Sequence, residues 1–535
     1  MAEASSQVVA QPATPELDPP PAFGIETKVC EQYQTDSKIS SSNANRHLTV
    51  QETVGVTASL TLVKSAEGVP NVSGGPPDPT LWPKWKKRRV LFIVCVFYFL
   101  FTFITTVTVP TFNDLQVGYE QVTYTVAVPA LALAVSPFFW TPLAETLGRR
   151  SVMVLGCLVA FLASIGVALE NNYRGYMAFR FLQGWGVGPA STVGLQMIED
   201  IYLEHERGQK VGYWCLAIDI GLLFGPLIGG FAALASWNFP NWLTVIIFGA
   251  LLLVMVLFLP ETGYPVRLQE YPSTQPPLPT HDESAPVKTL PWLNFRTLPG
   301  LARPKPWESI VRFSRLFAFP NIVVTIMFYC WTWYWFILCV ITMLPGAYPD
   351  YNPQVQGLLF LGFIIGTLIS EMLFSGGLSD YLVQRSALKN NGIRIPEKRL
   401  LLYFPAAILT TVGLILFGCT VQFNWHWFIA QIATFLVGTG IQMGNTTTIS
   451  YVVDAYPGHV MDVTLFYTFH LNLAAFASPF FIVPWIERIG WAWSFGTQGA
   501  IVTTCCLIVA PLLYVYGQKL RDWKGPIWWG NAQVA

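Results

Sequence analysis

Twelve apolar runs, each close to the length of a bilayer crossing, constrain the fold of this chain more than any other feature. A helix needs about 20 apolar residues to span the hydrocarbon core, so each run predicts one membrane-spanning helix. The expected spans are residues 90–109, 121–141, 151–169, 175–197, 211–235, 241–260, 317–343, 356–377, 400–421, 426–449, 463–486 and 492–516. We therefore expect an all-α membrane protein with the lipid bilayer around it.

Composition agrees with a membrane protein and argues against other classes. Of 535 residues, 53% are hydrophobic and 12% charged, whereas soluble domains carry about 25% charged residues. Lysine plus arginine, 31, equals aspartate plus glutamate, 31, so no nucleic-acid partner is indicated.

Short motifs give no sign of catalysis or of a cofactor. The nine cysteines are scattered, mostly inside apolar runs, without disulfide or metal-ligand spacing. No Walker loop, zinc-ligand pair or hydrolase nucleophile elbow occurs. We expect neither an enzyme nor an ATP-driven pump, and no metal site or cofactor.

Basic residues gather in alternate connections, which the positive-inside rule assigns to the cytosol. Those on this side are Lys84, Lys86, Lys87, Arg88, Arg89, Arg149, Arg150, Arg207, Lys210, Arg385, Lys389, Arg394, Lys398, Arg399, Lys519, Arg521 and Lys524. The other connections hold only Arg174 and Arg488. Both termini are therefore expected in the cytosol, and the plasma membrane is the expected location.

Two polar stretches divide the chain. Residues 1–84, rich in Pro, Ser, Thr and Gln, are expected to form a disordered cytosolic tail. The proline-rich residues 261–316 predict a cytosolic linker. The remaining spans fall into an N-terminal half, 85–260, and a C-terminal half, 317–516, followed by a tail, 517–535.

A self-comparison suggests that the two halves are related. Residues 184–202 align without gaps on 438–456 with five identities: Gly184 with Gly438, Gly186 with Gly440, Thr192 with Thr446, Asp200 with Asp454 and Tyr202 with Tyr456. Two related six-helix halves around a central cavity are typical of secondary transporters.

Three segments resemble motifs of the major facilitator superfamily. "TPLAETLGRR" (141–150) is similar to the loop between the family's second and third helices, although Thr141 and Thr146 replace its usual glycine and basic residue. "RFLQG" (180–184) resembles the fourth-helix motif. "GLLFGPLIGG" (221–230) resembles the fifth-helix signature of proton-driven antiporters. The chain is most similar to fungal twelve-span drug:proton antiporters.

The resemblance implies an architecture and several residue roles. It implies two pseudo-symmetric six-helix halves, alternating access and a monomer in the membrane. The implied gating loop comprises Glu145, Gly148, Arg149 and Arg150, with Asp380 of "GLSD" at the matching place in the second half. The implied helix-packing signature comprises Gly221, Gly225, Pro226, Gly229 and Gly230.

Asp219 is the leading candidate for proton coupling. It lies eight residues into the fifth span, roughly 12 Å from the cytosolic end at 1.5 Å per residue. An ionised carboxylate there costs about 2.5 to 3.5 kcal/mol unless it faces water or is protonated. We expect Asp219 to bind the proton, a cationic substrate, or each in turn. The alternative is an acid satisfied by one internal hydrogen bond.

Two further charged residues inside spans are proton-coupling candidates. Arg180 lies in the fourth span, and in the resembling family this arginine is implicated in coupling; the alternative is a structural arginine bonded to backbone carbonyls. Glu371 lies in the eighth span, and its role is open between coupling and structural pairing.

The expected substrate cavity draws on polar and aromatic residues. The seventh span contains "FYCWTWYWF" (328–336), whose aromatic density exceeds what an interfacial belt needs. Consecutive residues point in different directions, so at least half of these rings are expected to face lipid instead. The cavity candidates are Gln183, Tyr329, Trp331, Trp333, Tyr334, Trp335, Asn445, His470 and Asn472. For His470 the alternative is a packing residue, which a lone histidine in an apolar span more often is.

These features predict a proton-coupled secondary transporter that exports small lipophilic or cationic compounds. Its partners would be a small-molecule substrate, protons and the bilayer. One alternative is a proton-driven importer of an organic cation or polyamine. Another, of a different class, is a nutrient receptor that does not transport.

Overall fold

The computed structural model describes residues 79–109, 119–170, 172–236, 238–263, 305, 307–390, 395–456, 458–525 and 527. Within these ranges the chain is helical and contains no strand. Most of the expected N-terminal tail, 1–84, and most of the expected linker, 261–316, lie outside the described residues.

The first half follows a short 3-10 turn, η1 (Pro79–Leu81). Its helices are α3 (Lys84–Thr106), α4 (Tyr119–Leu147), α5 (Arg149–Leu169), α6 (Tyr173–Val187), α7 (Pro189–Ile201), α8 (Glu204–Ala232) and α9 (Phe239–Phe258).

The second half begins with a short helix, α10 (Glu308–Leu316). Its spans are built from α11 (Pro320–Tyr329), η4 (Cys330–Tyr334), α12 (Trp335–Ala347), α13 (Pro353–Leu358), α14 (Leu361–Ser370), η5 (Glu371–Ser375), α15 (Gly377–Lys389), η6 (Pro396–Leu402), α16 (Tyr403–Gln422), α17 (Trp427–Ala455), α18 (Val460–Ile489) and α19 (Trp491–Lys524). Of these, η4 and η5 are π-helical turns and η6 is a 3-10 helix.

Eleven helices in the described part of the chain are long and apolar enough to cross a membrane. The expected fourth span is divided between α6 and α7, which meet at Gly188. Pro189 occupies the first turn of α7, where its missing N–H costs nothing but prevents continuation of α6. Counting α6 and α7 as one interrupted crossing restores the predicted order of spans.

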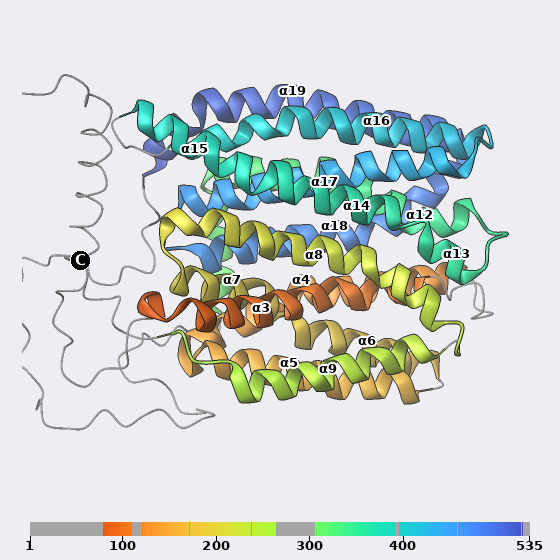
Figure 1. Ribbon diagram of the computed structural model, residues 1–535, viewed down its shortest axis with the longest axis horizontal. Helices are drawn as coiled ribbons and strands as arrows, with labels where there is room; N and C mark the ends of the chain where they lie inside the picture. The colour runs from red at the N-terminus through yellow and green to blue at the C-terminus, as the bar shows by residue number, and fades with distance from the viewer. Residues whose placement is uncertain are drawn as a thin grey trace, which may run out of the picture. The chain divides into compact units, whose positions relative to one another are not determined.

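The two halves repeat the same helix pairings (Figure 1). In the first half α3 packs on α8, α4 on α6, and α5 on both α6 and α9. In the second half α12 packs on α18, α14 on α17, and α16 on both α17 and α19. This correspondence is what a duplicated six-helix unit produces.

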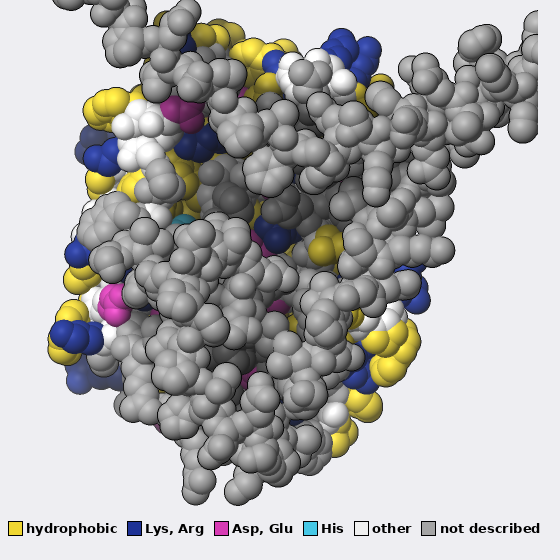
Figure 2. Space-filling model, turned by 90° about the vertical axis from the view of Figure 1, so that its left-hand side faces the viewer, with side chains coloured by type: hydrophobic (Ala, Val, Ile, Leu, Met, Phe, Trp, Pro, Cys, Tyr) yellow, Lys and Arg dark blue, Asp and Glu magenta, His cyan; other side chains and the backbone are white. Residues whose placement is uncertain are grey.

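Two seams join the halves. Along one, α4 and α7 contact α18; along the other, α8 contacts α13, α14 and α17. We call the end of the bundle where α3 begins and α19 ends the terminal face, and the other end the opposite face. Lys and Arg side chains lie around the rim of the terminal face (Figure 2).

Small residues allow close packing inside the first half. A Cβ atom at Gly221, Gly225 or Gly229 would collide with backbone or threonine atoms of α3 and of Val107 directly after it. Thr102 Oγ1 and Thr106 Oγ1 donate to the carbonyls of Ile218 and Leu222 at 2.6 and 2.9 Å. Such contacts replace the hydrophobic driving force that helices lack inside a bilayer.

Candidate transport site

Asp219 on α8 connects the two halves through buried hydrogen bonds. Its Oδ2 accepts from Nδ2 of Asn445 on α17 at 2.9 Å. The Oδ1 of Asn445 in turn accepts from the hydroxyl of Tyr467 on α18. Asp219 is 1% exposed, and its Oδ1 has no hydrogen-bond partner among the described residues. A carboxyl group of the first half is thus held by side chains of the second.

Glu371 forms a second buried carboxyl centre, whose hydrogen-bond donors both lie in the second half. Its Oε2 accepts from Gln442 Nε2 at 2.7 Å and from Thr446 Oγ1 at 3.2 Å, both on α17. Its Oε1 has no partner among the described residues. Gln442 and Asn445 lie three residues apart on α17, about 4.5 Å along the axis, so one face of this helix serves both carboxyl groups.

A small cavity lies between α3, α4, α8, α12 and α18. Its volume is about 20 Å³, close to the space of about one water molecule. The predicted cavity residues Tyr334 and Asn472 line it, and its polar lining also includes Thr102, Thr105, Thr106, Thr342 and Ser478. A cavity of this size has no room for an organic substrate.

The halves touch on both sides of this cavity. Toward the opposite face the rings of Tyr124 on α4 and Phe480 on α18 are 5.7 Å apart, and Gly230 on α8 abuts the Pro353 carbonyl. Toward the terminal face the rings of Phe138 on α4 and Phe469 on α18 are 5.6 Å apart.

The aromatic residues of the seventh span divide among three environments. Tyr334 lines the central cavity, and Tyr329 is buried with its hydroxyl donating to the Ile441 carbonyl at 3.4 Å. Trp333 is buried within the second half, where its Nε1 donates to Thr410. Trp331 and Trp335 are half-buried and pack on each other. Among the predicted rings, Tyr334 is the one that lines this cavity.

Arg180 and Gln183 lie away from the carboxyl centres. Arg180 is fully buried and donates to the carbonyl of Ile104 at 2.7 Å and to the hydroxyl of Thr108 at 2.6 Å, at the end of α3. A cation there complements the C-terminal end of the helix. Gln183 accepts from Arg180 and donates to Ser164 on α5. These contacts match the structural alternative for Arg180 and direct Gln183 into the first half rather than the cavity.

His470 faces α10 instead of the central cavity. Its ring stacks on Phe313 of α10 with centroids 5.8 Å apart, and its Nδ1 lies 2.8 Å from the Phe466 carbonyl. These are the contacts of a packing residue, which is the alternative to a place in the substrate cavity. The ring is 4% exposed and serves as packing between α18 and α10.

Arg312 on α10 joins the two halves at the terminal face. Its guanidinium NH1 is 3.0 Å from Glu145 Oε1 on α4 and 3.8 Å from Asp462 Oδ1 on α18. NH2 also bonds Glu308 at 2.8 Å. Burial would raise the pKa of Glu308, but the hydrogen bond and charge of Arg312 outweigh it and hold that pKa below its usual value. Arg312 therefore forms an ionic latch over the α4–α18 seam.

The predicted gating loop is divided among several partners. Gly148, with φ of 95°, occupies the left-handed region that favours glycine and lets α5 begin directly afterwards. Arg149 pairs with Asp200 on α7, and Arg150 donates to the Val256 carbonyl at 2.9 Å. Glu145 contacts Arg312 rather than either arginine of its own loop. In the described structure the loop contributes Glu145 to the latch.

The second half carries the counterpart of the Arg149–Asp200 pair. Arg399 is 2.9 Å from both Asp380 on α15 and Asp454 on α17, and Asp454 is the residue that the self-comparison aligns with Asp200. Gly208 on α8 abuts Asp380 and Arg399. Among the side chains that the structure describes, the second seam is closed at the terminal face by glycine packing rather than by an ionic latch.

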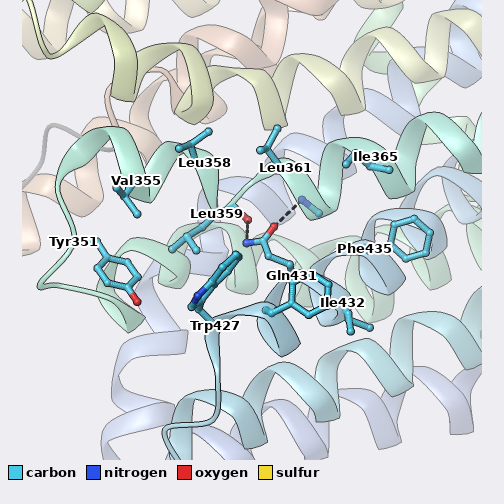
Figure 3. A pocket seen from close by; sticks show the side chains of 12 residues that line it. Tyr351, Val355, Leu358, Leu359, Leu361, Ile365, Trp427, Gln431, Ile432 and Phe435 are labelled. Atoms are coloured by element: carbon cyan, nitrogen blue, oxygen red, sulfur yellow. Dashed lines mark hydrogen bonds between the residues drawn. The ribbon is translucent and has the colours of Figure 1, made fainter.

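A larger groove lies outside this site (Figure 3). It has a volume of about 920 Å³ and is lined mostly by apolar side chains of α13, α14 and α17. Its amide residue, Gln431, is bonded to the backbone at the break between α13 and α14, accepting from Gly362 N–H and donating to the Leu359 carbonyl, each at 3.0 Å. The groove therefore offers no charged group to a substrate.

Several functional candidates were missed from the sequence. Gln442, Thr446 and Tyr467 support the carboxyl groups, and Arg312 forms the latch. Gln442, Asn445 and Thr446 follow one another at helical spacing, so a polar stripe in an apolar span was a usable signal. Arg312 sits four residues after Glu308, a spacing that suggests a short helix with an ion pair.

The described residues contain no group of three or more His, Cys, Asp or Glu that could hold a metal ion.

Comparison with known proteins decides the family. Residues 90–479 match the model of the Major Facilitator Superfamily. The chain belongs to the major facilitator superfamily. It is therefore a multi-pass membrane transporter that carries a small-molecule substrate, rather than an enzyme.

Relatives from fungi match over most of their length. The chain is 26% identical to "Efflux pump radE" of Floropilus chiversii, covering 92% of this chain and 93% of the relative. It is 27% identical to "MFS transporter fsa7" of Fusarium sp. (strain FN080326), covering 83% and 87%. The "Probable efflux pump mfs2" of Aspergillus flavus is 25% identical, covering 76% and 96%.

Solved structures share the fold. The human organic anion transporter MFSD10 (TETRAN) superposes with a TM-score of 0.55 at 16% identity, covering 80% of this chain and 100% of that one. The xylose transporter XylE from E. coli gives 0.55 at 14% identity, covering 80% and 99%. At these identities the likeness is one of fold alone.

Proposed function

We propose that this transporter exports small lipophilic or cationic compounds across the plasma membrane in exchange for protons, with Asp219 as the coupling carboxyl. The observation that carries the proposal is the bond between Asp219 and Asn445, because it joins a buried acid of one half to an amide of the other.

The bond links the charge of Asp219 to the position of the halves. An ionised carboxylate within the bilayer costs about 2.5 to 3.5 kcal/mol unless it has partners or water. Its partner Asn445 moves with the second half, so opening the seam removes the bond and leaves the charge to be neutralised by a proton or a cationic substrate. When the halves close again, Asp219 holds either a proton or a cationic substrate, but not both.

The lining of the central cavity supports the substrate class. Hydroxyl groups of Thr102, Thr105 and Ser478 and the ring of Tyr334 offer weak polar contacts and an aromatic face. Aromatic faces attract organic cations by about 0.5 to 2 kcal/mol, and Asp219, one helical turn from the lining residue Leu222 on α8, would supply the opposite charge. The names of the fungal relatives, which include efflux pumps, favour export.

The distribution of basic residues favours a cytosolic terminal face, with both chain ends on that side. We also propose that a single chain completes the transport unit. Rocking of residues 85–260 against residues 317–516 would expose the site alternately at the two faces.

The test is flux in vesicles that contain the purified protein, with rhodamine 6G as a fluorescent lipophilic cation. Accumulation that depends on an acidic lumen, exceeds that in protein-free vesicles and disappears with an uncoupler is expected. Accumulation that needs an alkaline lumen would indicate proton-driven import instead. Absence of protein-dependent flux in either gradient would contradict the proposal and favour a receptor that does not transport.

A further inference from the structure

Glu371 lies in the seam between α8 and the second half. A Cβ at Gly212 on α8 would collide with its Oε1, and one at Gly376 would approach the same atom to 2.9 Å. Glu371 is 4% exposed, and this Oε1 is the oxygen without a partner among the described residues. A buried, unsatisfied carboxylate oxygen therefore points at the backbone of the other half.

The two amides that serve the carboxyl groups differ in their freedom. Asn445 has its oxygen engaged by Tyr467, which fixes its NH₂ group as a donor toward Asp219. Gln442 has no described partner for its Oε1. Rotation of that amide would present either a donor to an ionised Glu371 or an acceptor to a protonated one. Glu371 thus has a bonding partner in both protonation states.

Glu371 also lies on a line from Asp219 toward the terminal face. Gly212 precedes Asp219 by seven residues on α8, about 10 Å along the axis. Beyond Glu371 come Asp380, paired with Arg399, and Gly208. The other groups around Glu371 are Cys215 and Asp219 from α8 and the neutral Gln442 and Thr446 from α17. Glu371 begins a π-helical turn, a feature frequent at functional sites.

We propose that Glu371 is a second proton-carrying group, which relays protons between Asp219 and the terminal face along the α8–α15 seam, the part of the second seam where α8 contacts α15. The inference rests on the proposed proton coupling through Asp219. In each transport cycle, the carboxylic O–H bond of Asp219 first breaks, and the proton passes through water to the Glu371 carboxylate. Glu371 then releases that proton through water past Asp380, and no oxidant or reductant is needed.

The first experiment compares gradient-driven accumulation of rhodamine 6G with its exchange at equal pH, in vesicles. For Glu371→Gln we expect accumulation to fall by about a hundredfold, the lower end of what a positioned proton-transfer group contributes. Exchange should fall far less, because it requires no net proton movement. Glu371→Asp should restore part of the accumulation. An equal loss in both assays would mean a structural role and overturn the relay, as would no loss in either.

A matched pair of glycine variants tests the seam without altering the carboxyl group. Gly212→Ala places a methyl group against Glu371 Oε1, whereas Gly377→Ala adds the same group where nothing lies within 4 Å. Accumulation should fall in Gly212→Ala and remain at the wild-type level in Gly377→Ala. Equal behaviour of the two variants would contradict the seam as the route.

Infrared difference spectra between acidic and alkaline pH test proton binding without any substrate. The wild type should show carbonyl bands of buried carboxylic acids, and Glu371→Gln and Asp219→Asn should each remove a different one. Retention of all bands in Glu371→Gln would overturn the relay. If Glu371→Gln removes its band but wild-type accumulation ignores the pH gradient, the proposed antiport fails while proton binding by Glu371 stands.

Discussion

The fourth and tenth spans hold equivalent places in the two halves but differ at their centres. Gly188 and Pro189 divide the fourth span into two helices, whereas α17 runs unbroken for 29 residues. The alignment of residues 184–202 with 438–456 puts Gln442 opposite Gly188 and Asn445 opposite Ser191. The second half therefore supplies the amides that hold both carboxyl groups, at positions where the first half supplies a helix break.

The terminal face shows the reverse, because there the two halves have kept the same device. Arg149 pairs with Asp200 in the first half and Arg399 with Asp454 in the second. Duplication thus preserved the ion pairs that hold helix ends together, while the central chemistry diverged. The proposed coupling relies on this asymmetry, because in it the Asp219 carboxyl loses its amide partner when the halves separate.

The largest effect is expected from breaking the Arg399 cluster. The Arg399 side chain is 5% exposed and that of Arg149 is 20% exposed. Loss of one partner from a buried pair costs about 3 to 5 kcal/mol, so Arg399→Met should lower the thermal unfolding midpoint in detergent substantially. Arg149→Met, nearer to water, should lower it less. Equal unfolding midpoints for the two variants would show that the deeper burial of the Arg399 pair does not add to stability.

An intermediate effect is expected at the Arg312 latch, which distinguishes the α4–α18 seam from the glycine-packed α8–α15 seam. Arg312→Gln should loosen α10, and its backbone amides should exchange with deuterium about tenfold faster. Arg312→Lys keeps the charge but cannot bond Glu145 and Glu308 through separate nitrogens, so it should recover only part of the protection. Unchanged exchange in Arg312→Gln would remove the latch from the account.

The smallest effect is expected from two aligned threonines. Thr446 donates to Glu371, whereas Thr192, its counterpart, bonds Thr141 at 3.2 Å. A single hydrogen bond contributes about 0.5 to 1.5 kcal/mol, so Thr446→Val should slow gradient-driven rhodamine 6G accumulation by about threefold to tenfold. Thr192→Val removes the same hydroxyl from an equally buried position and should leave the rate unchanged. A similar slowing in both variants would attribute the effect to packing.

The order of the spans could be predicted from the sequence, because length and hydropathy alone determine where a chain can cross a bilayer. The break at Gly188 was missed, although the adjacent proline was a visible signal. The π-helical turns η4 and η5 were also missed, since they depend on contacts between spans rather than on local preference.

The site could be predicted only in part. Asp219 and Glu371 were visible because ionisable residues are rare inside spans, and Asn445 and Asn472 lie near Asp219 and at the cavity. Gln183 bonds within the first half and His470 packs on α10, since a polar residue in a span can face its own half as easily as the cavity. The Arg312 latch could not be derived, because it depends on where a short helix after the linker returns to the bundle.

The most direct test of the central claim is the gradient-driven accumulation of rhodamine 6G by Asp219→Asn in vesicles. Asp522→Asn, the same chemical change at an exposed position, is its matched control. The account predicts that accumulation by Asp219→Asn falls to the level of protein-free vesicles, while exchange at equal pH is still measurable and Asp522→Asn matches the wild type. Continued concentration of the dye by Asp219→Asn at the expense of the pH gradient would contradict it.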